Sequence, residues 1–238
     1  PGVRAGRRKS AAPLNFTLGV TNLTMLAFKF RTAENLHFVI DILVHRRLYC
    51  APTTTLNDIR EGDVRVGQDQ DREVAILEYG IEVNKQVREL RVCALTKTFD
   101  NHLLWAHYAG GYNGLAFELD IPDEDLGAVE YGDNFIFLSN FADTFSPEET
   151  ARAVLLKKYK DWSYEQEVRL FSKTPFYTLT RPIKRIILGS RASPALTAAL
   201  QILCAHYQIE LERMVIADWG IYAMGSQESP LLRKQSDA

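Results

Sequence analysis

Two glutamates and an arginine alternate along one stretch of the chain and could do acid–base or electrostatic chemistry together. Glu165, Glu167 and Arg169 are separated by single residues. On a β-strand they would share a face, with neighbouring carboxylates roughly 7 Å apart. The guanidinium could hold one carboxylate ionised while the other keeps a proton or binds a sugar hydroxyl. The alternative is a solvated strand face with a surface ion pair, which stabilises little.

A second stretch combines aromatic and histidine side chains. Trp105, His107 and Tyr108 lie close together before a Gly-Gly pair, and a short helix over these residues could stack a planar ligand ring. His102 and His107 are five residues apart, so they do not face one another on a helix as a metal pair would, and no metal is expected. The alternative is a short helix that its Trp and Tyr hold in the hydrophobic core.

Two cations alternate with aromatic residues in the first expected strand. Lys29 and Arg31 follow Phe28 and Phe30, just before a predicted helix. Cations in this position can bind a phosphate with the help of amides at a helix N-terminus. Equally, they are typical of edge strands, where charge discourages aggregation. The chain has no Walker A sequence and no glycine-rich dinucleotide motif after a strand.

Hydrophobic periodicity predicts the elements that position these residues. The strongest local signal is Ser146-Pro147-Glu148-Glu149, where a capping Ser precedes Pro at the first helical position and Glu follows three residues after the cap. We expect Lys157 and Lys158 to end that helix. Alternation predicts strands at 25–31, 47–51, 91–96, 114–119, 162–171, 183–188 and 210–217. Helical spacing predicts helices at 33–46, 72–87, 147–158 and 194–206, with a short helix between Asp100 and Gly110.

Several strands interrupted by separate helices predict an α+β fold. We expect one domain at 25–225, with a curved, mainly antiparallel sheet and helices packed around it. A flexible lead-in at 1–24 and a polar tail at 226–238 would flank this domain.

The composition narrows the class of protein. The chain has 238 residues, of which 46% are hydrophobic and 24% charged, so wholesale disorder is excluded. A net charge of -2 means that a nucleic-acid partner would have to bind to a local basic patch. No apolar run is long enough to span a membrane. Cys50, Cys93 and Cys204 cannot all pair, which predicts buried core thiols and a reducing, cytoplasmic setting.

The same stretches, in this order, resemble a bacterial and phage family described as domain of unknown function 2971. The resemblance covers roughly residues 26–190, and the chain departs from the family pattern at Ile59-Arg60, where Pro and an aromatic are usual. The matching pieces are Ala27-Phe28-Lys29-Phe30-Arg31, Arg47-Leu48-Tyr49 through Leu56-Asn57-Asp58, residues 104–109, residues 114–117, Lys157 with residues 162–169, and Ile186-Ile187-Leu188-Gly189.

The order of elements is also remotely similar to that of ADP-ribosyltransferases, including toxins that modify nucleic acid. This resemblance implies NAD as a co-substrate, a cation on the first strand, an aromatic residue in the middle and a catalytic glutamate on a late strand. The candidates for these roles are Lys29 or Arg31, then Trp105, His107 or Tyr108, then Glu165 or Glu167.

Of the two glutamates we expect Glu167 to be the catalytic one, because it has a same-face neighbour on either side. Asn57, Asp58 and Arg169 are further candidate site residues.

Two classes of function follow from these patterns. The first is NAD-dependent ADP-ribosyl transfer by a toxin or phage-defence effector that modifies nucleic acid or protein. The alternative is a non-catalytic module that binds nucleic acid or a partner protein in a defence or toxin–antitoxin system, where the partner could be an antitoxin. Such a module would not require Glu165 or Glu167. A nuclease is disfavoured, because no dense group of Asp, Glu and His residues for Mg²⁺ is evident.

Overall fold

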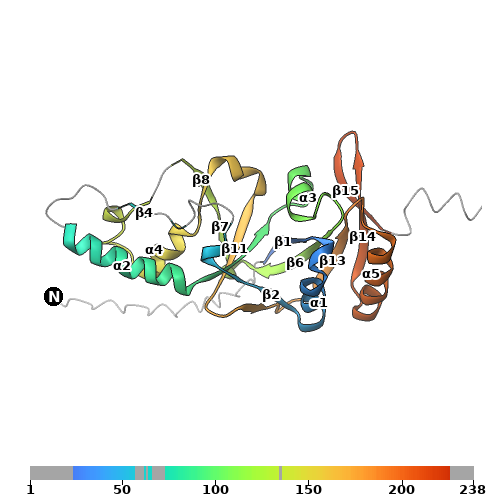
Figure 1. Cartoon of the computed structure of the whole chain (residues 1–238), viewed down its shortest axis with the longest axis horizontal. Coiled ribbons are helices and arrows are strands. Elements are labelled where there is room, and N and C mark those ends of the chain that lie inside the picture. The colour runs from blue at the N-terminus through green and yellow to red at the C-terminus, as the bar shows by residue number, and fades with distance from the viewer. Residues whose placement is uncertain (1–23, 57–61, 63, 66–72, 134–135, 226–238) are drawn as a thin grey trace, which may run out of the picture.

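One long, curved sheet forms the centre and one side of the protein, and a group of helices and short strands lies beyond its other end (Figure 1). The computed structural model describes residues 24–56, 62, 64–65, 73–133 and 136–225, so Asn57, Asp58, the tail and all but the last residue of the expected lead-in lie outside it. The strand order is β15-β14-β13-β6-β1-β5-β11-β7, with β3 beside β5. Within this sheet, as far as the described residues show, only the pair β13–β14 is parallel. The predicted α+β fold with a mainly antiparallel sheet is therefore confirmed.

The strands of this sheet are short, and three further strand pairs lie beside it. The main sheet comprises β1 (Thr24–Arg31), β3 (Ala51–Pro52), β5 (Arg91–Thr96), β6 (Leu115–Pro122), β7 (Leu126–Ala128), β11 (Glu167–Ser172), β13 (Ile183–Leu188), β14 (Glu210–Ala217) and β15 (Gly220–Gly225). The separate pairs are β10 (Lys157–Tyr159) with β8 (Glu130–Gly132), β12 (Phe176–Thr178) with β2 (Arg47–Tyr49), and β4 (Val64–Arg65) with β9 (Ile136–Phe137).

Helices cover both faces of the sheet and one of its ends. Helices α1 (Leu36–His45) and α5 (Pro194–Tyr207) share a hydrophobic core with one face, and α3 (His102–Tyr108) packs on the other. Helices α2 (Glu73–Glu89) and α4 (Pro147–Val154) enclose a third core at the end near β11 (Figure 1). No helix in the described ranges is both long and apolar enough to cross a membrane. The 3₁₀ turns are η1 (Ala33–Asn35), η2 (Thr53–Thr55), η4 (Asp123–Asp125), η5 (Leu138–Asn140) and η6 (Lys160–Glu165).

The predicted helices are confirmed with shifts at their ends. Ser146 Oγ accepts a hydrogen bond from Glu149 N, and Glu149 accepts one from Ser146 N, so the predicted capping box opens α4. The residue that caps α3 is Asn101 and not Asp100. Helix α1 begins after the turn η1, and Thr32 makes no side-chain cap. The three cysteines are reduced and buried, as predicted.

Two predictions around the late strand are wrong. Residues 160–165 form the turn η6 instead of the first half of a strand, because Gln166 adopts a left-handed conformation, with φ of 44°, that separates the turn from β11. Helix α4 ends at Val154, so Lys157 and Lys158 do not close it. They lie on β10, which pairs with β8.

Strands β1 and β5 touch at one point and then separate. Strand β1 pairs with β6 over eight residues, from Thr24 to Arg31, but it pairs with β5 only at Phe28 opposite Thr96. Beyond this point the side chain of Lys29 crosses the gap, and its Nζ donates to the carbonyl of Ala94 at 2.6 Å. The sheet therefore opens between two of its central strands.

The capping box provides a test of the local structure. We expect Ser146→Ala to lower the free energy of unfolding by about 1 kcal/mol, because the first turn of α4 loses its side-chain acceptor. Ser190→Ala, at an exposed turn, should change it by less than about 0.5 kcal/mol. Urea unfolding of both variants measures the difference, and equal losses would contradict the capping role.

Candidate functional site

A cavity of about 420 Å³ lies where β1 and β5 separate. It is within the usual size range of small-molecule sites. One part of its wall carries the cations of β1, and another carries an ion cluster from β10, η6 and β11, with side chains of α3 beside it. The predicted site residues that line this cavity are Lys29, Arg31, His107, Tyr108, Glu165, Glu167 and Arg169.

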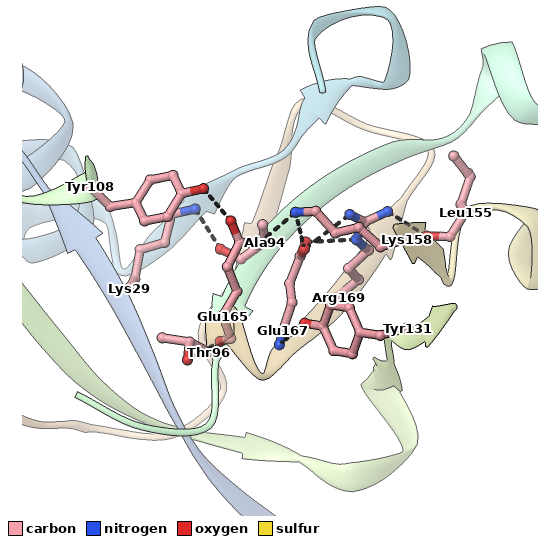
Figure 2. A network of polar contacts seen from close by, with 10 residues as sticks. All are labelled: Lys29, Ala94, Thr96, Tyr108, Tyr131, Leu155, Lys158, Glu165, Glu167 and Arg169. Atoms are coloured by element: carbon pink, nitrogen blue, oxygen red, sulfur yellow. Dashed lines mark hydrogen bonds and ion pairs between the residues drawn. The ribbon is translucent and has the colours of Figure 1, made fainter. Parts of the chain in front are cut away.

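Lys158, Glu165, Glu167 and Arg169 form a buried ion cluster (Figure 2). The amine of Lys158 lies 2.6 Å from Glu165 Oε2 and 2.8 Å from Glu167 Oε2. Arg169 Nε lies 2.7 Å from Glu167 Oε1, and another nitrogen of the same guanidinium donates to the carbonyl of Leu155. All four side chains are at most 6% exposed. The alternative of a solvated strand face is therefore wrong.

The two carboxylates meet for a different reason from the one that alternation suggested. Glu165 ends the turn η6, Glu167 begins β11, and the left-handed Gln166 between them turns both side chains towards the same amine. Two hydroxyls hold this junction in place. Thr96 Oγ1 donates to the carbonyl of Glu165, and Tyr131 Oη accepts from the amide of Glu167 at 2.7 Å.

The two glutamates have opposite electrostatic environments. Burial raises the pKa of Glu165 above its ordinary value, against the hydrogen bonds that Lys158 and Tyr108 donate to its carboxylate. Burial would also raise the pKa of Glu167, but Arg169 and Lys158 outweigh it and hold this pKa below its ordinary value. Glu165 is thus the carboxylate that can more readily exchange a proton, and Glu167 stays ionised.

Lys29 and Arg31 bring positive charge to the cavity. Burial lowers the pKa of both side chains. Neither makes an ion pair within the described part of the chain. Lys29 donates to the carbonyl of Ala94 and also interacts with the side chain of Cys93. Arg31 Nε and Thr32 Oγ1 are buried and have no hydrogen-bond partner among the described residues. Buried polar atoms without partners destabilise the fold, and a bound ligand with acceptor oxygens would satisfy them.

Trp105 does not lie where the sequence suggested. Its side chain is fully buried, its Nε1 donates to the carbonyl of Phe99 at 2.6 Å, and its ring packs edge-on against Phe30. Trp105 therefore anchors α3 in the hydrophobic core, which is the alternative that the sequence also allowed. Tyr108, near the end of the same helix, reaches the cavity instead and donates to Glu165 Oε1.

Sequence reasoning missed Lys158 and two aromatic residues of the cavity. Lys158 was expected to end a helix, but it lies between the glutamates. Its nearness in sequence to Glu165 was the available signal. Phe38 and Tyr49 both line the cavity. Tyr49 lies in one of the stretches that carry the family resemblance, and nothing in the sequence distinguished Phe38 from a core residue.

The comparisons with known proteins found no match, whether to family models, to curated proteins or to solved structures. The resemblance to the family described as domain of unknown function 2971 therefore stays a prediction. The same holds for the remoter resemblance to ADP-ribosyltransferases.

The ion cluster predicts unequal effects of two matched substitutions. We expect Glu167→Gln to lower the free energy of unfolding by about 3 kcal/mol, because it removes the carboxylate that the two buried cations Lys158 and Arg169 share. Glu165→Gln should cost about 1 kcal/mol, the size of one hydrogen bond, because burial already disfavours its charged form. Glu130→Gln, which breaks an exposed pair with Lys157, should cost less than about 0.5 kcal/mol. Urea unfolding ranks the three variants, and equal losses at 165 and 167 would contradict the assignment.

The same cluster predicts how stability depends on pH. The pKa of Glu167 is lower in the folded protein than in the unfolded chain, where a glutamate titrates near about 4.3. Its stabilisation is therefore fully present above that pH and is lost as the pH falls through the lower, folded value. We expect the difference in unfolding free energy between wild type and Glu167→Gln to be largest near neutral pH and to shrink between about pH 4 and pH 2. A difference that grew towards acid pH would contradict this.

Proposed function

We propose that the protein binds NAD in the cavity and transfers its ADP-ribosyl group to an acceptor. One observation carries this proposal: a buried carboxylate with a raised pKa, Glu165, shares a cavity with two cations that have no carboxylate partner among the described residues. The combination suits a ligand that carries phosphates next to a sugar, in which the bond between this sugar and its base is broken during the reaction.

The balance of charge supports a diphosphate. With both carboxylates ionised, the charges of the four side chains of the cluster sum to zero, since Lys158 and Arg169 face two carboxylates. Lys29 and Arg31 then leave an excess of two positive charges on the cavity wall. The diphosphate of NAD carries two negative charges and would neutralise them. A fixed cation pair in a partly buried cavity binds such a group more strongly than it would in water.

The transfer needs a group that favours positive charge on the ribose. In the proposed reaction the bond between C1 of this ribose and the nicotinamide nitrogen breaks, and its electron pair leaves with neutral nicotinamide. The oxocarbenium-like ribose that develops is stabilised by the carboxylate of Glu165. An acceptor hydroxyl, amine, carboxylate or water then bonds to C1, and Glu165 accepts the acceptor's proton where there is one to lose.

The geometry favours Glu165 over Glu167 for this role, although the residue pattern favoured Glu167. Arg169 and Lys158 occupy both oxygens of Glu167, so this carboxylate acts as a positioning residue that keeps Lys158 in place. Lys158 and Tyr108 in turn fix the orientation of the Glu165 carboxylate. The acceptor and the setting, a toxin or phage-defence effector acting on nucleic acid or protein, stay predictions from the resemblance.

Release of nicotinamide from NAD tests the proposal. We expect wild-type protein to release nicotinamide and Glu165→Gln to do so more slowly by a factor on the order of 10²–10³, because the substitution keeps the shape and removes the charge. Glu130→Gln is the control, because it makes the same chemical change at an exposed glutamate outside the cavity, and it should retain full activity. Thermal melting of each variant separates lost chemistry from lost folding. Full turnover by a folded Glu165→Gln variant, or no release by wild type with water, protein or nucleic acid as acceptor, would overturn the proposal.

A further inference from the structure

We infer that the part of the cavity next to α1 is a binding site for a nucleoside diphosphate, in which Phe38 and Tyr49 stack the base and Arg31 with Thr32 binds phosphate. We call this part the α1 end. Its residues are Arg31, Thr32, Asn35, Phe38 and Tyr49, all of which line the cavity. The inference deepens the proposed function. Only the placement and reaction of the remaining sugar near Glu165 rest on that function, and the binding of the nucleoside diphosphate does not.

The aromatic wall comes from two different elements. Phe38 projects from α1 and Tyr49 from β2, and their ring centroids lie 5.6 Å apart with 30° between the ring planes. Both rings are partly exposed and border the cavity. The rings are tilted relative to one another, so a nucleobase would stack on the part of either ring that borders the cavity, whatever the identity of the base. An inorganic anion would make no use of the rings.

The guanidinium of Arg31 lies beside one of these rings. The guanidinium carbon of Arg31 lies 5.4 Å from the centroid of Phe38, so the ring supports the guanidinium without competing for its donors. Arg31 Nε and Thr32 Oγ1 are the two buried polar atoms of this end that lack a partner among the described residues. Both residues line the cavity, where a phosphate would pair with the guanidinium and supply acceptor oxygens to such donors.

The α1 end is separate from the carboxylates. Arg31 lies three residues along β1 from Phe28, or roughly 10 Å at the usual rise of a strand. Phe28 is opposite Thr96, which binds the backbone of Glu165. Lys29 lies between the two ends and can take a second phosphate. A base at Phe38 and Tyr49 with a diphosphate along Arg31 and Lys29 would therefore point the remaining sugar towards Glu165.

Calorimetric titration with ADP, pyrophosphate and adenosine tests the inference. We expect ADP to bind at least about tenfold more tightly than either part, because base and phosphates have separate contacts. Phe38→Leu and Tyr49→Leu should each weaken ADP binding about tenfold and leave pyrophosphate binding unchanged. Arg31→Gln should weaken both ligands. Tyr49→Phe keeps the ring and should keep the affinity, as should Phe137→Leu, which removes an exposed ring outside the cavity.

Each result decides between the possibilities. ADP binding no tighter than pyrophosphate binding would mean a site for anions only and would overturn the inference. Unchanged ADP affinity in folded Phe38→Leu and Tyr49→Leu variants would overturn it as well, and Thr32→Val provides a milder second test of the phosphate contact if Arg31→Gln does not fold. ADP binding without nicotinamide release would overturn the proposed reaction and leave the inference standing. Nicotinamide release together with unchanged ADP affinity in the Phe38→Leu and Tyr49→Leu variants would overturn the inference and leave the proposed reaction standing.

Discussion

The buried amine of Lys158 is the interaction on which the site depends. A lysine removed from water must be paired, and here two carboxylates from adjacent elements supply the pairing. Arg169 balances the second carboxylate and reaches the carbonyl of Leu155, just after α4. The cluster therefore ties β10, η6 and β11 to the end of a helix. Any one of these charges left alone would be costly, so the four hold each other in a fixed arrangement and with it the orientation of Glu165.

The second constraint is the separation of β1 from β5. A continuous sheet would pair the backbone groups of these strands beyond Phe28, but here the side chain of Lys29 binds the carbonyl of Ala94 instead. Two cations line the cavity at this gap, and two buried polar atoms beside it, Arg31 Nε and Thr32 Oγ1, have no hydrogen-bond partner among the described residues. Folded proteins tolerate such local losses mainly at functional sites. We therefore interpret the opening in the sheet as part of the candidate site.

The two constraints together give the cavity two chemically different ends. One end holds a neutral ion cluster that presents a single protonatable carboxylate. The other has aromatic rings beside a cation. A ligand that fills both ends needs a planar group, negative charge and a polar group that reacts, in that order. The NAD that we propose as the ligand carries a base, a diphosphate and a reactive ribose in that order.

The sequence by itself determined most of the helices and main strands, apart from residues 160–165 and the end of α4, and residue type identified most of the charged groups of the cavity. Periodicity and capping act over a few neighbouring residues, which is why α4 begins at Ser146 as predicted and why the cations and carboxylates were recognisable. Only the tertiary structure decided which groups meet. Lys158 became a partner of Glu165 because η6 turns the chain back onto β10, and Trp105 became a core residue because α3 packs against β1. Burial and charge pairing depend on contacts between distant segments, so local pattern could not distinguish a buried ion cluster from a solvated strand face.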